Sequence, residues 1–264
     1  MTHFSRMVSA ITDGMKNACA DMHSFCNSPS QQFNAEYLFT VATARAIDRF
    51  NGPPADPYEI RIEHSTREFA RDCLPVWKRV GSPLRPNSTI LRAKQPRPNI
   101  KRSGRIDIAV YHDSNSSTHL FGSQPLCAIE LKGFNPPRHL VLEDLRRNLD
   151  FHRLDGATGP SVLDLSFFGA LHSRSAKRAT NNEQSVKERY RKWITELGPI
   201  RDLVTHILTF TVSIDATGEV VEEVNEWVLD TTTIHHFIGA IVVFERPKSV
   251  GGVGTACPTD AMRP

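Results

Sequence analysis

The chain has 264 residues, enough for one large domain or two small ones, and its 39% hydrophobic and 23% charged residues exclude a disordered or fibrous protein. Its five cysteines are scattered and odd in number, which argues against a disulfide framework and for a reducing, cytoplasmic compartment. No run of about 18 apolar residues occurs, and the N-terminal stretch lacks the apolar core of a signal peptide, so we expect no membrane association and no secretion.

The net charge of +3 is unevenly distributed along the chain. Residues 66–105 contain eleven Lys and Arg but only two acidic residues, so this segment carries +9 and, against the total of +3, the remainder carries −6. A basic stretch beside an acidic remainder is typical of proteins that bind phosphate groups, although a solvated basic loop has the same pattern. We expect nucleic-acid contacts from Arg92, Lys94, Arg97, Lys101, Arg102 and Arg105.

In the first half of the chain, helical spacing of apolar residues predicts an N-terminal helix that buries Val8, Ile11, Met15, Ala18 and Met22. A second helix is predicted from the capping residue Asn34 to about Phe50, with its buried side at Leu38, Val41, Ala42 and Ile47. Residues 58–64 alternate and predict a strand, and residues 65–75 predict a short helix capped by a serine. Residues 81–104 hold four prolines and predict a long irregular loop.

In the second half, residues 105–112 and 126–134 predict two strands that pair as a hairpin, followed by an amphipathic helix over 139–154. Further elements are a strand over 162–172, a helix over 185–197 and strands over 204–214, 223–230 and 233–245. This order predicts an α/β fold, with a central mixed sheet flanked by helices. We divide the chain into an N-terminal helical segment (1–33), an α/β domain (34–246) and a flexible tail (247–264).

Two charged residues interrupt the apolar strand CAIELKGF, where burying them costs several kcal/mol each unless they are paired or functional. Glu130 and Lys132 share one face of this strand because side chains alternate. Asp107, in the preceding strand RIDIAVYH, can lie beside them if the two strands pair. Carboxylate oxygens suit Mg²⁺ or Mn²⁺, and a metal with a neighbouring lysine can activate water against a phosphate.

Asp107 followed by Glu130-Leu131-Lys132, within GRIDIAVY and LCAIELKGF, resembles the PD-(D/E)xK nuclease superfamily. The resemblance spans roughly residues 34–172, although Ile106 stands where the family's proline would be. It implies a restriction-endonuclease-like core of helix, three strands, helix and strand, with a C-terminal extension. It also implies a metal held by Asp107, Glu130 and the backbone carbonyl of Leu131, a lysine (Lys132) that assists the water, and further site residues at Glu36, Glu143, Asp144 and Arg147.

The function that this resemblance implies is a divalent-metal-dependent nuclease, with DNA favoured over RNA, in defence or mobile-element biology. A homodimer or a protein partner would fit an enzyme that cuts both strands of a duplex. One alternative is a nuclease-fold module that binds nucleic acid or a protein without cutting, and another is an unrelated α/β domain with a fortuitous motif.

For several of these residues a purely structural role is an alternative to a role in a functional site. Glu130 and Lys132 could form an ion pair on a solvated face, and Asp107 could pair with Arg105 or Lys132. Glu63 on the first strand could reach the site. A zinc site at Cys19, His23 and Cys26 has helical spacing but no evident fourth ligand, so a partly buried helix face is the better interpretation.

Overall fold

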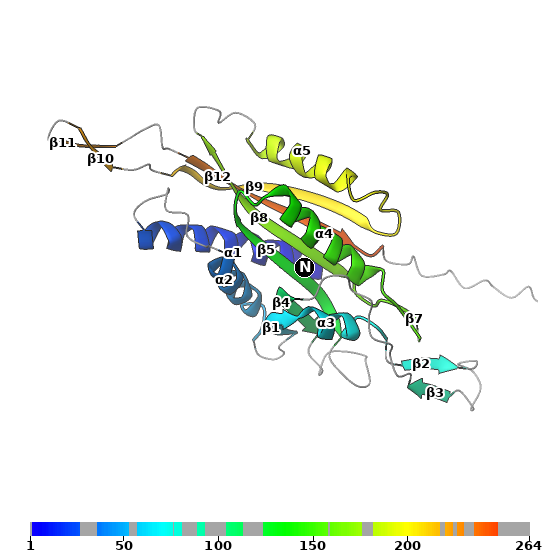
Figure 1. Cartoon of the computed structure of the whole chain (residues 1–264). Helices are drawn as coiled ribbons and strands as arrows, with labels where there is room; N and C mark the ends of the chain where they lie inside the picture. Colours follow the sequence, from blue (N-terminus) through cyan, green and yellow to red (C-terminus); the bar gives the residue numbers. More distant parts are fainter. Residues whose placement is uncertain are drawn as a thin grey trace, which may run out of the picture.

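The computed structural model describes residues 2–26, 36–52, 57–75, 77–80, 89–92, 104–112, 124–157, 159–175, 182–216, 220–223, 226–229 and 235–247. Its centre is a six-stranded sheet in the order β1-β4-β5-β8-β12-β9 (Figure 1). The central neighbours β5 and β8 run parallel and all other neighbours run antiparallel, so the sheet is mixed. The strands are β1 (Tyr58–Ser65), β4 (Arg105–His112), β5 (Pro125–Phe134), β8 (Leu165–Ser175), β9 (Val204–Ala216) and β12 (His235–Glu245).

Helices cover both faces of this sheet (Figure 1). The helices α1 (His3–Cys26) and α2 (Glu36–Asp48) pack on one face, and α4 (Arg138–His152) and α5 (Asn182–Thr195) pack on the other. The short helix α3 (Thr66–Asp72) packs against β4 beside α4. Three separate two-stranded sheets complete the described chain: β2 (Trp77–Val80) with β3 (Thr89–Arg92), β6 (Asp155–Gly156) with β7 (Gly159–Pro160), and β10 (Val220–Glu223) with β11 (Glu226–Leu229).

The central strand β5 is buried on both faces, and this decides the environment of the charged motif. Ile129 and Leu131 belong to the core beneath α1 and α2, whereas Ala128 belongs to the core beneath α3 and α4. The predicted alternation along β5 is therefore confirmed. The face of β5 that carries Glu130 is covered by α4 and is not open to water. Strands that are buried on both faces consist almost entirely of apolar residues, and β5 follows this pattern except at its charged residues.

The predicted α/β fold with a mixed sheet is confirmed. The N-terminal helix is confirmed as α1, which buries Ile11, Met15, Ala18 and Met22 in the same core as α2 and the sheet, whereas Val8 is only half-buried against that core. The second helix is confirmed as α2, but its predicted buried side is partly wrong. Ile47 is buried, whereas Leu38, Val41 and Ala42 are only half-buried, and the fully buried face instead holds Phe39, Thr40, Thr43, Ala44 and Ala46.

The physical reason for this difference is the close approach of α1. A Cβ atom on Gly14 would lie 2.4 Å from Thr43 Oγ1 and 2.6 Å from Thr43 Cα, so the two helices touch through small residues. Close packing of this kind places threonine and alanine at the contact rather than leucine.

Three further predictions are corrected by the structure. The predicted loop 81–104 contains β3, which pairs with β2 in an antiparallel hairpin. The predicted strand over 223–230 is divided between two strands, because Glu223 is the last residue of β10 and pairs with Glu226, the first residue of β11. The helix expected at 185 begins at Asn182, because polar residues extend it without contributing to its apolar face. Residues 248–264 of the predicted tail lie outside the described residues.

Within the described residues, none of the helices combines the length and the apolar character needed to cross a membrane.

Candidate active site

The pairing of β4 with β5 brings the first two motif residues together. Ile108 pairs with Ile129, so the next step of the antiparallel register places Asp107 alongside Glu130. Asp107 Oδ2 accepts a hydrogen bond from the backbone N–H of Leu131 at 2.6 Å. The pairing of β4 with β5 ends here, and the Asp107 carboxylate accepts the hydrogen bond of the Leu131 N–H in place of a backbone carbonyl.

Glu130 lies beneath α4 and is only 1% exposed. Its Oε2 atom forms an ion pair with Arg147 Nη2 at 2.5 Å, and the same nitrogen lies 3.0 Å from Asp144 Oδ1. Asp144 and Arg147 are three residues apart on α4, which places both on the helix face that packs on the sheet. The Arg147 Nη1 atom donates to the backbone carbonyl of Arg105 at 3.4 Å, so one arginine connects α4 to both β4 and β5.

Lys132 joins the sheet to α2. Its Nζ atom donates to Glu36 Oε1 at 2.6 Å and lies 3.5 Å from Asp144 Oδ2. Glu36 is the first residue of α2, and β5 passes close to it, because a Cβ atom on Gly133 would lie 3.9 Å from the Glu36 backbone nitrogen. We refer to these six residues as the charged cluster: Glu36, Asp107, Glu130, Lys132, Asp144 and Arg147.

Burial and mutual repulsion alter the acidity of the charged cluster. Burial raises the pKa of Asp107 to about 6, although the Leu131 N–H and Lys132 act in the opposite direction. Burial also raises the pKa of Glu130 well above its usual value, with Asp107 and Asp144 adding to the effect and Arg147 opposing it. Both carboxyl groups therefore hold their protons more tightly in the folded protein than they would in water, chiefly because they are buried.

Lys132 behaves differently from a buried lysine without partners. Burial works to lower its pKa, but the carboxylates of Asp144, Glu36 and Asp107 outweigh burial, so its pKa is raised. Lys132 is therefore a cation at neutral pH and can donate hydrogen bonds, but it cannot accept a proton.

The charged cluster has an excess of negative charge. Four carboxyl groups face one ammonium and one guanidinium group, so full ionisation leaves two negative charges. Glu130 Oε1 is buried and has no hydrogen-bond partner in the described part of the chain. No three His, Cys, Asp or Glu side chains among the described residues are arranged to hold a metal ion by themselves. A cation here would use two carboxylates, a backbone carbonyl and water.

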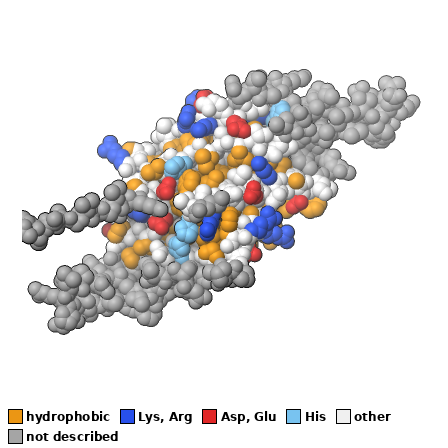
Figure 2. All heavy atoms as spheres, turned by 180° about the vertical axis from the view of Figure 1, so that it is seen from behind, with side chains coloured by type: hydrophobic (Ala, Val, Ile, Leu, Met, Phe, Trp, Pro, Cys, Tyr) orange, Lys and Arg blue, Asp and Glu red, His pale blue; other side chains and the backbone are white. Residues whose placement is uncertain are grey.

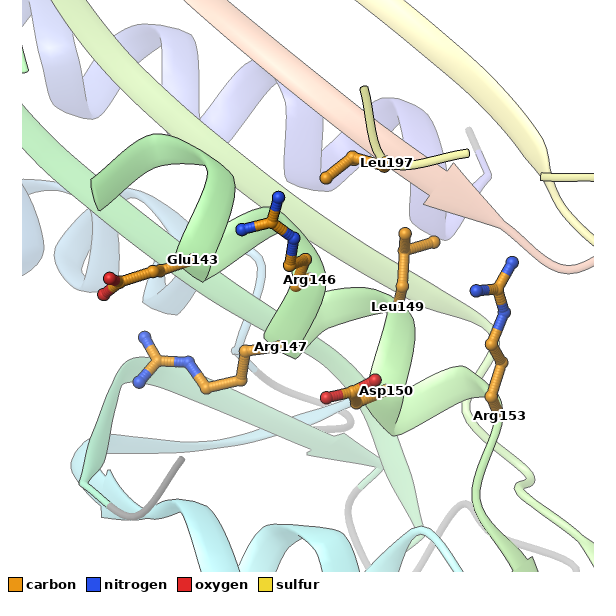
Figure 3. Close-up of a pocket in the computed structure, with 7 residues that line it drawn as sticks. All are labelled: Glu143, Arg146, Arg147, Leu149, Asp150, Arg153 and Leu197. Carbon is orange, nitrogen blue, oxygen red and sulfur yellow. The ribbon is translucent and has the colours of Figure 1, made fainter. Parts of the chain in front are cut away.

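A pocket of about 470 Å³ adjoins the charged cluster on the outer side of α4. Figure 3 shows Arg146 and Arg147 projecting from α4 around it and Arg153 projecting from the residue that follows α4, with Leu197 approaching from the segment after α5. Arg153 is engaged by Asp202, with its Nη2 atom 3.1 Å from Oδ1. Arg147 thus borders both the pocket and the charged cluster, while Glu143 and Asp150 add acidic groups to the pocket wall.

The structure describes only part of the predicted nucleic-acid interface. Arg105 is exposed at the start of β4, directly beside the charged cluster. Arg92 ends β3, but its side chain lies outside the described residues, as do Lys94, Arg97, Lys101 and Arg102 entirely. On the face seen in Figure 2, the described Lys and Arg side chains are scattered among hydrophobic and neutral ones, so that view displays no single basic patch.

All five predicted core site residues, Glu36, Asp107, Glu130, Leu131 and Lys132, meet at one place, together with Asp144 and Arg147. Glu143 is exposed on α4 and lines the adjoining pocket beside Arg147, so its place in the site stays a prediction (Figure 3). Glu63 is exposed, with a left-handed backbone (φ 52°), and no hydrogen bond or ion pair joins it to the charged cluster, all of whose members are described.

The purely structural roles that the sequence allows for Glu130 and Asp107 differ from the contacts observed. Glu130 does not form an ion pair with Lys132 on a solvated face, because it is buried and its partner is Arg147. Asp107 binds the Leu131 backbone instead of Arg105. The Glu130–Arg147 pair has no signal in the sequence, since only the packing of α4 onto β5 brings these two residues together. Cys19 is buried with a free thiol, and the side chains of His23 and Cys26 lie outside the described residues.

Comparison of the chain with family models, with curated proteins and with solved structures gives no match of any of the three kinds.

Proposed function

We propose that this protein is a divalent-metal-dependent nuclease that hydrolyses phosphodiester bonds in nucleic acid, with DNA the favoured substrate, and that the charged cluster is its active site. The observation that carries the proposal is the convergence of Asp107, Glu130 and Lys132 near the start of β4 and the end of β5. Two carboxylates with raised pKa values lie beside a lysine held as a cation, at the margin of a buried sheet.

The order of elements supports the proposal. The sequence α2, β1, β4, β5, α4, β8 agrees with the helix, three strands, helix and strand that the resemblance to the PD-(D/E)xK superfamily implies. The elements α3, β2 and β3 are inserted between β1 and β4, and the short strands β6 and β7 between α4 and β8. Asp107 lies on the second of these strands, and Glu130 and Lys132 lie on the third. In this interpretation β12, β9 and α5 form the C-terminal extension of a restriction-endonuclease-like core.

The residues present fit a divalent cation. The surplus of carboxyl groups over cations in the charged cluster, the hard oxygen donors and the buried, unbonded Glu130 Oε1 all favour Mg²⁺ or Mn²⁺. Asp107, Glu130 and the backbone carbonyl of Leu131 would hold the ion, and water would complete its coordination. When bound, the ion would lower the pKa of a coordinated water and neutralise charge that develops on the phosphate.

The chain's own residues then have separate roles. Lys132, as a permanent cation, donates hydrogen bonds to the attacking water and to a phosphate oxygen. Glu36 and Asp144 hold its ammonium group in place from two different helices. Arg147 fixes the Glu130 carboxylate against the sheet. The water oxygen bonds to phosphorus as the bond to the leaving oxygen breaks, the proton of the water passes to solvent, and the leaving oxygen takes up a proton from solvent.

A second candidate function is a nuclease-fold module that binds nucleic acid or a protein partner without cutting. The observation that favours it is the ion pair between Glu130 and Arg147, because a buried guanidinium can balance this carboxylate without a metal ion. Metal-dependent cleavage separates the two functions.

The test incubates the purified protein with supercoiled plasmid, single-stranded DNA and RNA, in Mg²⁺, Mn²⁺ or EDTA. The proposal predicts metal-dependent cleavage of at least one substrate that is lost in Glu130→Ala and Lys132→Ala and kept in Glu188→Ala, an exposed glutamate on α5. Absence of cleavage by the folded wild type, with all substrates and metals, would favour the binding module.

A further inference from the structure

Beyond the charged cluster, β8 extends past the end of β5. Lys132 pairs with Ala170, and the backbone N–H of Asn135 donates to the carbonyl of Leu171, where the pairing ends. Ala170 packs beneath α4 and α5, and alternate residues of a strand share a face, so Arg174 lies on this same face. At about 3.3 Å per residue, Arg174 lies roughly 13 Å along β8 from the residue beside Lys132.

The helix α5 brings a second arginine to this end of the sheet. His172 Nε2 and Tyr190 Oη lie 3.0 Å apart, which fixes α5 against β8 at this level. Arg189 directly precedes Tyr190 and is half-buried. Arg189 lowers the pKa of Arg174, after the larger effect of burial, and both arginines lower the pKa of His172. We refer to Arg174 and Arg189 as the arginine pair.

No ion pair in the described part of the chain involves Arg174 or Arg189. Two nitrogens of Arg174, Nε and Nη2, are buried and have no hydrogen-bond acceptor among the described residues. The Cζ atom of Arg189 lies 5.9 Å from the centroid of the Trp193 ring. The two acidic side chains on α5 accept hydrogen bonds from neutral groups, Glu183 Oε1 from Thr211 at 2.6 Å and Glu188 Oε1 from Gln184 at 2.8 Å. Buried donors without acceptors are rare in proteins, because each one loses its hydrogen bond to water on folding.

We infer that the arginine pair is a phosphate-binding site for the nucleic-acid strand that the charged cluster cleaves, an inference that rests on the proposed function. Nε and Nη2 form the edge of a guanidinium that can bind two oxygens of a phosphate at once, and they are the two Arg174 nitrogens without acceptors among the described residues. This edge is buried in the free protein and Arg174 as a whole is half-buried, so phosphate binding requires the side chain to turn towards solvent. The pair shares its sheet face and its sheet end with Lys132. A strand with one phosphate at the charged cluster can therefore place another phosphate on the arginine pair.

The test measures equilibrium binding of a labelled DNA duplex and of its single strand in EDTA, where cleavage does not interfere. The variants are Arg174→Ala, Arg174→Lys and Arg189→Ala, and the matched control is Arg191→Ala, an exposed arginine on the same helix. We expect Arg174→Ala to weaken binding by about 10- to 100-fold, because it removes a charge-assisted hydrogen-bonded contact. The slope of log affinity against log salt should also fall by about one unit. Arg174→Lys keeps the charge but loses the fork, so its affinity should be intermediate.

Thermal unfolding provides a second measurement that requires no nucleic acid. Inorganic phosphate should raise the melting temperature of the wild type, relative to chloride at equal ionic strength, and this rise should be absent in Arg174→Ala. The free Arg174→Ala protein should fold normally, because Nε and Nη2 donate no hydrogen bond to the described residues that the substitution could remove. Arginine-pair variants that bind both DNA probes as tightly as Arg191→Ala would overturn the inference.

The phosphate site and the proposed nuclease activity can fail independently of each other. A wild type that cuts nothing but loses DNA binding on substitution of the arginine pair would retain the phosphate site and reject the nuclease. A wild type that cuts, with arginine-pair variants that bind normally, would reject the phosphate site and leave the nuclease intact.

Discussion

Lys132 Nζ lies 2.6 Å from Glu36 Oε1, and this contact joins the end of the central strand β5 to the first residue of α2. The same ammonium group lies 3.5 Å from Asp144 Oδ2 on α4, on the other side of the sheet's margin. One cation is therefore positioned by helices from both layers of the fold. Its orientation depends on the packing of the whole domain rather than on the local sequence ELK.

Glu36→Gln should lower the rate of phosphodiester cleavage by about 10- to 100-fold, because outer partners that orient an active-site group typically contribute this much. Lys132→Met should lower it by about 100- to 1000-fold, since it removes the donor itself. Initial rates at saturating metal measure both effects, with Glu188→Gln as the control. A Glu36→Gln enzyme as fast as the wild type would reduce Glu36 to a surface ion-pair partner of Lys132.

Asp107→Asn and Glu130→Gln should both raise the free energy of unfolding in EDTA at neutral pH, because both carboxyl groups have raised pKa values in the folded protein. The amide that replaces the Asp107 carboxylate carries no charge, but its oxygen can still accept from the Leu131 N–H, so Asp107→Asn relieves repulsion. Glu130→Gln likewise removes a buried charge, while Arg147 keeps its ion pair with Asp144. Urea unfolding at neutral pH measures both, and a loss of stability in either variant contradicts the charge balance that we assign.

The stabilisation by Asp107→Asn should depend on pH. The pKa of Asp107 is raised from 3.8 to about 6 in the folded protein, so the folded state binds the proton more tightly than the unfolded state. The stability that this group contributes is fully present below pH 3.8 and is lost as the pH rises through about 6. The loss is roughly 3 kcal/mol at most, and the advantage of Asp107→Asn should grow over the same interval. If Asp107→Asn differs from the wild type in stability by the same amount at every pH, titration of Asp107 is not the cause of the difference.

The buried histidines should act in the opposite sense. Burial, reinforced by nearby arginines, lowers the pKa of His152 and His172 from 6.5 to about 3, so the unfolded state binds their protons more tightly. Their contribution is present above pH 6.5 and is lost as the pH falls towards 3, by about 1.4 kcal/mol per pH unit for each histidine. His172→Gln should flatten the acid side of the stability curve relative to the wild type. An unchanged slope would mean that His172 already carries its proton in the folded state.

Gly14→Ala tests the contact between α1 and α2. The added Cβ would lie 2.6 Å from the Thr43 Cα atom and 2.7 Å from its backbone nitrogen, so one helix must move. We expect a loss of about 1–3 kcal/mol in the free energy of unfolding, as is usual for overpacking. Gly52→Ala is the control, because its Cβ would meet nothing within 4 Å. Equal stabilities of the two variants would show that α1 packs less closely on α2.

The sequence predicts the strands of the charged motif well, because their apolar runs are long and bounded by polar connections. The strand RIDIAVYH has the observed limits of β4, Arg105–His112, and the pairing of β4 with β5 is as expected. Alternation along these strands suffices to place Asp107 beside Glu130.

The burial of the charged cluster beneath α4 could not be predicted, because it depends on how α4 packs on the sheet. The resemblance names Asp144 and Arg147 as candidate site residues, but the periodicity of the helix does not show that they are buried. The prediction for the buried face of α2 is also partly wrong, because Gly14 of a separate helix selects small residues for the contact. Tertiary contacts of this kind leave no local pattern.

The most direct test of the account is the rate at which Lys132→Ala cleaves the substrate found for the wild type, measured beside its affinity for Mn²⁺. The account predicts a folded protein that binds Mn²⁺, because Asp107, Glu130 and the Leu131 carbonyl remain, but cleaves at least about 100-fold more slowly, as expected when a donor to the transition state is lost. Cleavage at the wild-type rate by Lys132→Ala would contradict the assignment of the charged cluster as the active site.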